Sequence, residues 1–241
     1  APFPDPSASY TDPSVRIFVP EGFRDRGSQD LVLHFHGFGT TVAATLAGHL
    51  YQEHVFESGA NVVLVVPQGP VNASSGNFGK LMTPAGTLRL LKQVVEVLYR
   101  ENLITHPVVG DVALTSHSGG YQAVAQNINT ATLSIRQLDL FDSIYAYETR
   151  FETFAVNGGL LRSDYTTNGG TLDNNQLVAN DLQTQGLTVN TSPSQHALKA
   201  PAPLIFFSPT THDRSTRFQG AFGEQLRWTW KHSRRGPRVA I

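Results

Sequence analysis

The segment Asp111-Val-Ala-Leu-Thr-Ser-His-Ser-Gly-Gly-Tyr121 carries the strongest indication of a fold in this sequence. It opens as an apolar run typical of a buried strand, passes through small residues, and continues into a helical pattern. This succession of strand, sharp turn and helix is the context of a nucleophile elbow, a strained turn that exposes one serine at a strand end. Ser118 holds that position, with Ser116 and Gly120 two places away on either side. Glycine is more usual where Ser116 stands, and the alternative interpretation is a plain strand-to-helix turn.

On both sides of this segment, short apolar runs alternate with longer helical patterns. The predicted strands are Val15–Val19, Leu31–His36, Asn61–Val66, Asp111–Thr115, Gln137–Phe141, Leu160–Tyr165 and Pro203–Ser208. The predicted helices are Thr41–Ser58, Pro84–Arg100, Gly119–Asn129, Leu172–Gln185 and Ser215–Lys231. Such alternation is typical of right-handed crossovers and a mostly parallel sheet. The predicted fold class is therefore α/β, with three layers, a sheet of about seven or eight strands, and helices on both faces.

The size and composition of the chain favour one folded domain over residues 1–241, with an extended arm at 1–13 and a tail at 232–241. Hydrophobic residues make up 40% and charged residues 15%, a balance that argues against disorder. The formal net charge of −1 gives no field that would attract nucleic acid, so no nucleic-acid partner is expected. The absence of cysteine excludes disulfides, zinc–thiolate sites and thiol nucleophiles.

No apolar run is long enough to predict a membrane span. The chain opens at Ala1-Pro-Phe-Pro4 without an initiator methionine, which is consistent with a mature form after signal cleavage or with a trimmed chain. We therefore expect a secreted or periplasmic protein, with a cytoplasmic one kept as the alternative. The sequence makes no prediction of the oligomeric state.

A second segment, Leu31-Val-Leu-His-Phe-His-Gly-Phe-Gly39, ends a predicted buried strand in a glycine-rich turn. With this turn and the elbow, the chain resembles the α/β-hydrolase family from about residue 15 to residue 231. It is most similar to small serine esterases of that family, here with a Ser-His-Ser-Gly-Gly elbow. Members carry a His-Gly turn after the strand that precedes the first large helix, and the next residue donates an N–H to the oxyanion hole. The resemblance thus implies Phe38 and Gly119 as the two oxyanion donors.

The same segment also permits a metal-site hypothesis. His34 and His36 form a His-x-His pair on one face of a strand, as in metallohydrolases. Such sites need further Asp or His ligands close by, and the residues that follow are Gly, Phe and Thr. We therefore predict no metal and no cofactor, and interpret these histidines as hydrogen-bonded supports of the loop.

The family order places the histidine last, after the final strand, which predicts His212 as the base. Asp142, at the end of the strand after the elbow helix, is the favoured acid. The acid more commonly follows the next strand in this fold, so Asp164 and Asp173 remain alternatives.

These residues together predict a serine hydrolase that cleaves carboxylic esters through an acyl-enzyme. The residues expected to contact substrate are His117, Tyr121, Tyr145, Asn77 and Phe78. The short segment 143–159 leaves room for only a minimal lid, so the expected partner is a small-molecule or polymeric ester in an open cleft. The alternatives are a peptidase or amidase on the same triad, and a non-catalytic binding protein on a hydrolase scaffold.

Overall fold

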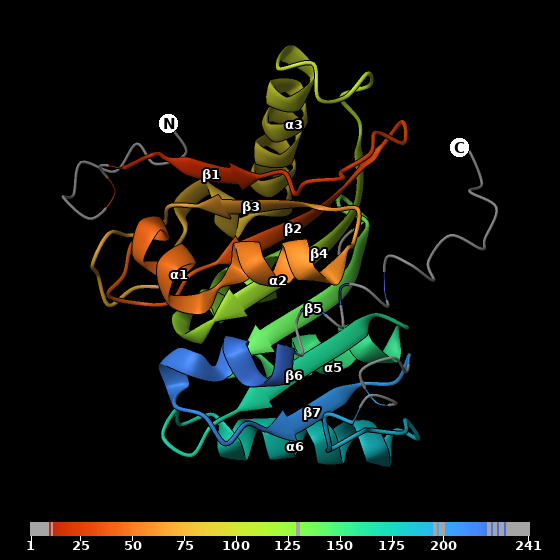
Figure 1. Cartoon of the computed structure of the whole chain (residues 1–241). Coiled ribbons are helices and arrows are strands. Elements are labelled where there is room, and N and C mark those ends of the chain that lie inside the picture. Colours follow the sequence, from red (N-terminus) through yellow and green to blue (C-terminus); the bar gives the residue numbers. More distant parts are fainter. Residues whose placement is uncertain are drawn as a thin grey trace.

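The computed structural model describes residues 10, 12–128, 131–194, 197, 201–220, 223, 226 and 229. Within them, one sheet runs in the order β1-β3-β2-β4-β5-β6-β7 (Figure 1). Its strands are β1 (Val15–Phe18), β2 (Gln29–Phe35), β3 (Val63–Pro67), β4 (Val109–His117), β5 (Ile135–Phe141), β6 (Leu160–Tyr165) and β7 (Leu204–Phe207). Strand β1 is antiparallel to β3, and the other neighbouring pairs are parallel. The predicted mostly parallel α/β architecture is confirmed.

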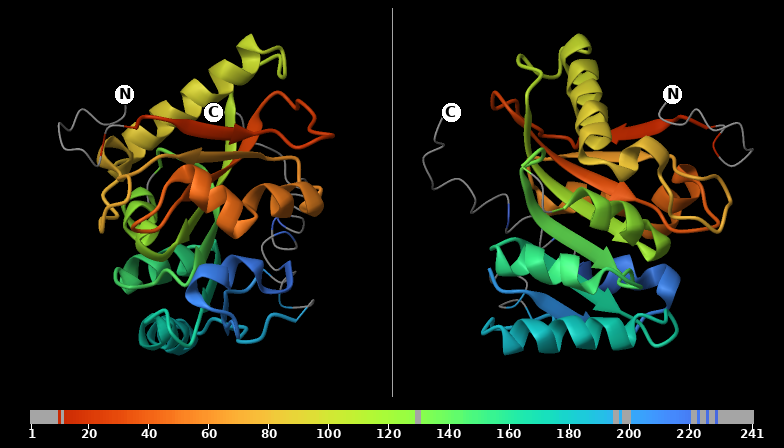
Figure 2. Two further views of the ribbon diagram at one scale, coloured as in Figure 1. Left: turned by 60° about the vertical axis from the view of Figure 1, so that its left-hand side comes forward. Right: turned by 180° about the vertical axis from the view of Figure 1, so that it is seen from behind.

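Six α-helices in the described residues flank the sheet. They are α1 (Val42–His49), α2 (Tyr51–Ser58), α3 (Pro84–Arg100), α4 (Tyr121–Asn127), α5 (Glu148–Val156) and α6 (Leu172–Thr184). Helices α1 and α2 lie over one face, while α3, α5 and α6 lie over the other, as the two turned views make clear (Figure 2). The described residues also include the 3₁₀ segments η2 (Gly79–Met82), η3 (Ser118–Gly120) and η4 (His212–Gly220).

The middle of strand β2 is apolar on both of its faces. Successive side chains of a strand point to opposite faces of the sheet. Leu31 and Leu33 therefore pack into the core beneath α3, α4, α5 and α6, whereas Val32 packs with residues of α1 and α2 on the other face. A sheet covered on both faces needs apolar side chains in both directions, which explains the continuous run in the sequence.

Several predicted elements are confirmed, and two regions differ from the prediction. Strand β6 and helix α3 have the predicted bounds. The single helix expected over 41–58 is wrong, because Leu50 adopts φ of 56° and divides it into α1 and α2. Helix α5, inside the segment 143–159 that was expected to hold only a minimal lid, was not predicted; its few buried apolar side chains, among them Phe151 and Phe154, give a weak periodic signal. It packs against α6 and β6, so it belongs to a helical layer.

The chain ends are described only in part. The helix predicted over 215–231 begins as the 3₁₀ segment η4, and Gly223, Leu226 and Thr229 are helical. Its remaining residues, the tail at 232–241 and most of the arm at 1–13 lie outside the described residues. Among the described helices, none has both the length and the apolar character that crossing a membrane requires.

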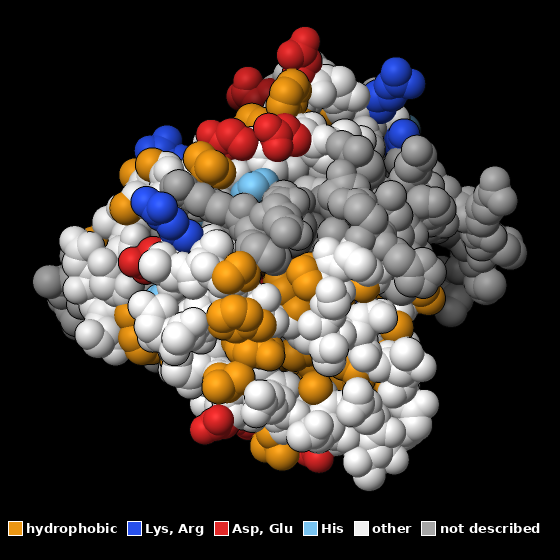
Figure 3. Space-filling view, turned by 60° about the horizontal axis from the view of Figure 1, so that its bottom comes forward, with side chains coloured by type: hydrophobic (Ala, Val, Ile, Leu, Met, Phe, Trp, Pro, Cys, Tyr) orange, Lys and Arg blue, Asp and Glu red, His pale blue; other side chains and the backbone are white. Residues whose placement is uncertain are grey.

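The β7 edge ends the sheet on one side. Seen from that end, hydrophobic side chains gather on the surface (Figure 3). Exposed hydrophobic residues of β7 and α6 include Phe207, Leu172 and Leu177.

Candidate active site

The carboxyl ends of β2, β4 and β5 meet at one edge of the sheet. Phe35 of β2 pairs with Ser116 of β4, and His117 of β4 pairs with Phe141 of β5. The turns after these three strands therefore begin at the same level. In open α/β sheets this edge is where ligands bind.

Ser118 stands on the turn after β4 in a strained backbone conformation. Its φ is 51°, a left-handed value that non-glycine residues rarely adopt. The turn continues through the 3₁₀ segment η3 into α4. Gly120 allows this sharp return, because a Cβ there would lie 2.2 Å from the carbonyl oxygen of Phe35. This sharp turn, residues 117–120, stands where the elbow was predicted and is called the elbow below; backbone strain of this kind clusters at functional sites.

Ser116, the departure from the usual glycine, has a structural role. It is fully buried, and its hydroxyl lies 2.8 Å from that of Ser143. The Ser143 hydroxyl donates its proton to the carbonyl oxygen of Ser118 at 2.7 Å, so Ser116 is the donor to Ser143. A short chain of hydroxyls thus ties the elbow to the end of β5.

The His36-Gly37-Phe38 turn after β2 packs directly on the elbow. A Cβ on Gly37 would lie 3.0 Å from Cβ of Ser118, and one on Gly119 would lie 2.0 Å from the Phe38 ring. The residues predicted as oxyanion donors, Phe38 and Gly119, are therefore in contact beside Ser118.

His36 holds this turn in place. Its Nδ1 donates to the carbonyl oxygen of Gly37 at 2.8 Å, and its Nε2 accepts from the backbone N–H of Gly69 at 2.9 Å. Both ring nitrogens are therefore occupied. Burial lowers the pKa of His36 and, more strongly, that of His34, whose Nδ1 lies 2.8 Å from the Thr115 hydroxyl. The geometry favours the loop-supporting interpretation of this pair over a metal site.

His212 meets Asp142 at the same edge. The Nδ1 of His212 lies 2.8 Å from Oδ2 of Asp142, across a sequence separation of 70 residues. The His212 backbone N–H donates to Oδ1 of Asn168 at 3.3 Å, which anchors the loop after β7. Among the described hydrogen bonds, none joins the Ser118 hydroxyl to the His212 ring.

Asp142 is fully buried, and its carboxylate accepts hydrogen bonds from the hydroxyls of Thr166 and Thr171 as well as from His212. Burial alone would raise the pKa of Asp142, but these hydrogen bonds outweigh it and lower the pKa. The backbone comes close as well, since a Cβ on Gly169 would lie 1.7 Å from Oδ2 of Asp142. The surroundings thus favour an ionised carboxylate aimed at His212.

The two alternative acids lie elsewhere. Asp164, in β6, is buried behind Asp142, where its Oδ1 accepts the backbone N–H of Asp142 at 2.8 Å. Burial raises the pKa of Asp164 to about 8, and the neighbouring Asp142 also raises it. Asp173 is exposed in the first turn of α6. The structure brings Asp142 to His212 and leaves the other two apart from it.

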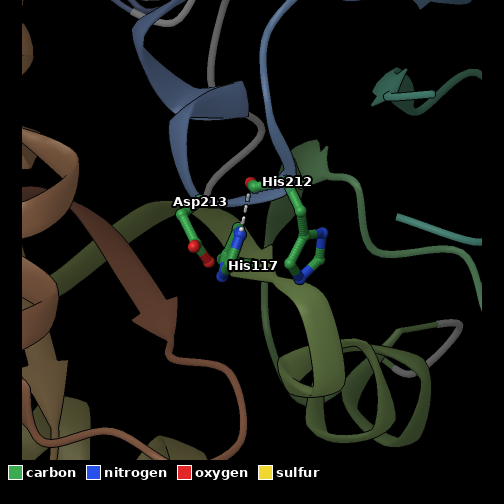
Figure 4. Close-up of side chains that lie close together, drawn as sticks. All are labelled: His117, His212 and Asp213. Carbon is green, nitrogen blue, oxygen red and sulfur yellow. Dashed lines mark hydrogen bonds between the residues drawn. The ribbon is translucent and has the colours of Figure 1, made fainter. Parts of the chain in front are cut away.

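His117 packs behind His212. Its ring centroid lies 4.5 Å from that of His212, and its Nε2 donates to the carbonyl oxygen of His212 at 2.9 Å (Figure 4). Burial lowers the pKa of His117 to about 3, with His49 and His212 contributing. The ring stack continues to His49 at 4.4 Å and to Tyr51 at 5.7 Å from His49. The expected substrate contact through His117 is corrected: the side chain is buried and supports His212.

Tyrosines flank the other side of Ser118. Tyr121 lies between Tyr145 and Tyr147, with ring centroids 5.7 and 5.9 Å away. The Tyr145 hydroxyl donates to the carbonyl oxygen of Gly169 at 2.5 Å. Burial raises the pKa of Tyr145 and so does Asp142, while a hydrogen bond with the Ser118 side chain opposes the rise. Tyr145 is thus a direct neighbour of Ser118.

One residue of the loop at 74–78 does not lie where the sequence predicted. Phe78 was expected to line a cleft, but it is fully buried against Phe35 and His36, with ring centroids 5.0 Å from each. Its apolar ring gains more from the core than from a polar loop surface. Asn77 is exposed, and the loop packs on the elbow, because a Cβ on Gly76 would lie 2.3 Å from the carbonyl oxygen of Gly119.

Four contributors to this site were not predicted from the sequence: the hydroxyls of Thr166 and Thr171, and the rings of His49 and Tyr51. The threonines follow β6 in a polar turn, and their proximity to a strand end was the available signal. The ring stack has no local signal, because His49 and His117 come from distant segments that only the folded chain joins.

Comparison with solved structures identifies the architecture. A ferulic acid esterase matches with a TM-score of 0.55 at 14% identity over 90% of this chain and 91% of its own. MPT51 (FbpC1) of Mycobacterium tuberculosis matches with a TM-score of 0.52 at 13% identity over 94% of both chains. A thermostable esterase matches with a TM-score of 0.53 at 12% identity, over 90% of this chain and 58% of its own.

This chain has the α/β-hydrolase fold. No protein-family model and no curated protein matches the sequence. At such low identities the structural likeness extends to the fold, and the chemistry must be argued from the α/β-hydrolase site itself.

Proposed function

We propose that this protein is a serine hydrolase that cleaves carboxylic esters, with Ser118 as nucleophile, His212 as base and Asp142 as acid. One observation carries the proposal: Asp142 binds Nδ1 of His212 at the sheet edge where Ser118 is held at φ of 51°. The esterases among the similar folds are consistent with this chemistry.

The hydrogen bond from Nδ1–H of His212 to Asp142 fixes the tautomer that leaves a lone pair on Nε2. Substrate binding brings the Ser118 hydroxyl to this nitrogen, since catalytic hydrogen bonds often tighten only in the complex. Oγ of Ser118 then forms a bond to the ester carbonyl carbon, and its proton passes to Nε2. The developing oxyanion is stabilised by the backbone N–H groups of Phe38 and Gly119, each worth about 3–4 kcal/mol in such sites.

Collapse of the tetrahedral intermediate breaks the ester C–O bond, and His212 returns the proton to the departing alkoxide. Water then attacks the acyl-enzyme with the same proton transfers in reverse order. Tyr145 neighbours Ser118, and Phe38 and Tyr147 expose 42% and 39% of their surfaces nearby. These rings, with Tyr121 and the exposed Asn77, are the proposed substrate contacts, and their open setting suits esters with accessible acyl groups.

Hydrolysis of 4-nitrophenyl acetate and of a matched anilide by the wild type and by Ser118→Ala tests the function. The variant should lose about 10⁴- to 10⁶-fold in kcat, because the nucleophile is gone. Ser74→Ala, which removes an exposed hydroxyl in a neighbouring loop, is the matched control and should retain full activity. Ester turnover by Ser118→Ala at the wild-type rate would refute the assignment, and faster turnover of the anilide would make the protein an amidase.

A further inference from the structure

Three side chains with metal-binding atoms converge beside the proposed base. His117, His212 and Asp213 each offer one ligand atom, and these atoms all lie within 4.8 Å of one another. Figure 4 shows the Asp213 carboxylate turned toward the His117 ring, with the His212 ring alongside. The three residues come from two segments, the end of β4 and the start of η4, which the hydrogen bond from His117 to the His212 carbonyl holds together.

The existing hydrogen bonds leave one nitrogen of each ring for a further ligand. Nδ1 of His212 is bound to Asp142, which leaves Nε2. Nε2 of His117 donates to the His212 carbonyl, which leaves Nδ1. Asp213 is exposed, so the cluster opens to solvent on the carboxylate side. A cation could therefore bind without breaking the bonds that position either ring.

We propose that His117, His212 and Asp213 bind a zinc ion that inhibits the enzyme. Two imidazole nitrogens and one carboxylate are typical zinc ligands, and a water completes the usual tetrahedron. Zn–N bonds of about 2.0–2.1 Å place tetrahedral ligands about 3.3 Å apart. The exposed side chain of Asp213 can close the remaining distance by a rotamer change. Mg²⁺ and Ca²⁺ prefer oxygen ligands, so this nitrogen-rich cluster should discriminate against them.

Inhibition follows from the atom that the metal occupies, and this step rests on the proposed function. The lone pair of Nε2 on His212 must accept the Ser118 proton. A zinc ion bonded there uses that lone pair and adds positive charge, so the base cannot act. Zinc and catalysis exclude one another because they need the same nitrogen.

The first experiment measures ester hydrolysis by tag-free protein against rising Zn²⁺, with Mg²⁺ as the control ion. Micromolar Zn²⁺ should inhibit the wild type reversibly, and chelator should restore the activity. Asp213→Asn removes an exposed ligand outside the proposed triad and should raise the half-inhibitory Zn²⁺ concentration at least tenfold. Asp173→Asn, an exposed aspartate on α6, is the matched control and should behave as the wild type. An active wild type unaffected by Zn²⁺, or inhibition unchanged in Asp213→Asn, would overturn the proposal.

Calorimetric titration of Zn²⁺ keeps this test separate from the test of the proposed function. The wild type should bind one more equivalent than Asp213→Asn at micromolar affinity, whether or not any ester is hydrolysed. Zinc binding without ester turnover would refute the hydrolase and retain the metal site. Identical titrations of the two proteins would refute the metal site, whatever the activity.

Discussion

The β2–β3 pair and the β5–β6 pair lie in the same sheet, yet they differ in how many polar and charged side chains they bury. Within β2 and β3 the buried residues are mostly aliphatic, such as Leu31, Leu33 and Val65. Strands β5 and β6 bury apolar residues as well, but with them a set of polar and charged ones. The polar and charged residues are Gln137, Asp139, Arg162, Ser163 and Asp164.

The difference has an electrostatic consequence. Burial raises the pKa of Asp139 to about 7 and that of Asp164 to about 8, and it lowers the pKa of Arg162 to about 10. These three residues all line one small pocket of about 10 Å³. Buried groups with shifted pKa values are more often found at functional sites than in plain cores. The comparison teaches that β2–β3 mainly stabilises the fold, while β5–β6 supports the proposed acid.

Among the variants that test this comparison, Asp142→Asn should have the largest effect on catalysis. Asparagine at this position favours the wrong tautomer of His212, so kcat for ester hydrolysis should fall about 10³- to 10⁴-fold. Steady-state kinetics of the purified variant measure the loss. Asp173→Asn is the control with an unchanged rate; the opposite pattern, an active Asp142→Asn and an inactive Asp173→Asn, would move the acid to α6.

Leu33→Ala tests how much the β2–β3 pair contributes to the stability of the fold. Leu33 is fully buried, so its truncation should lower the free energy of unfolding by about 2–5 kcal/mol. Denaturant unfolding measures this change, and kcat well below the transition should stay at the wild-type value. Leu103→Ala, with 48% of its surface exposed, should change stability by less than about 0.5 kcal/mol. A loss of kcat in folded Leu33→Ala would mean that β2–β3 also shapes the chemistry.

Asp164→Asn tests whether the buried carboxyl group of Asp164, in β6, makes the stability of the fold depend on pH. The folded pKa of about 8 lies above the unfolded value of about 4, so the folded state retains a proton that the unfolded state has lost. The contribution of Asp164 to stability therefore falls as pH rises between these values, by up to about 1.4 kcal/mol per pH unit. The asparagine side chain cannot titrate, and its carbonyl can still accept the Asp142 N–H.

The measurement is denaturant unfolding of both proteins at about pH 5 and about pH 7.5. The wild type should lose more stability across this interval than Asp164→Asn. Buried histidines such as His34 and His117 are present in both proteins, so their contributions cancel in the difference. Equal changes in the two proteins would show that Asp164 is not buried with a raised pKa.

The sequence predicted most of the strands and the sharp turn at Ser118 because their signals are local. An apolar run such as Leu31–Phe35 and the small residues around Ser118 carry their own structural preference. Helix α5 and the break at Leu50 depend on packing against distant segments, so no local pattern reveals them. The antiparallel placement of β1 and the order of the strands are likewise set by long-range contacts.

The candidate site was predictable in part for the same reason. Ser118, His212 and Asp142 each follow a predicted strand, and parallel strands end at one edge. The choice of Asp142 over Asp164 needed the folded geometry, since Asp142 directly follows β5 and Asp164 lies near the end of the neighbouring β6. The misplacement of Phe78 came from its polar neighbours, which concealed that its ring turns inward.

The most direct test of the central claim is labelling of the folded protein with a fluorophosphonate, followed by peptide mapping in a mass spectrometer. The probe forms a stable adduct with a serine that a neighbouring base activates. The account predicts one adduct on Ser118 in the wild type and none in His212→Ala. No adduct on folded wild-type protein, or equal labelling of Ser118 without His212, would contradict it.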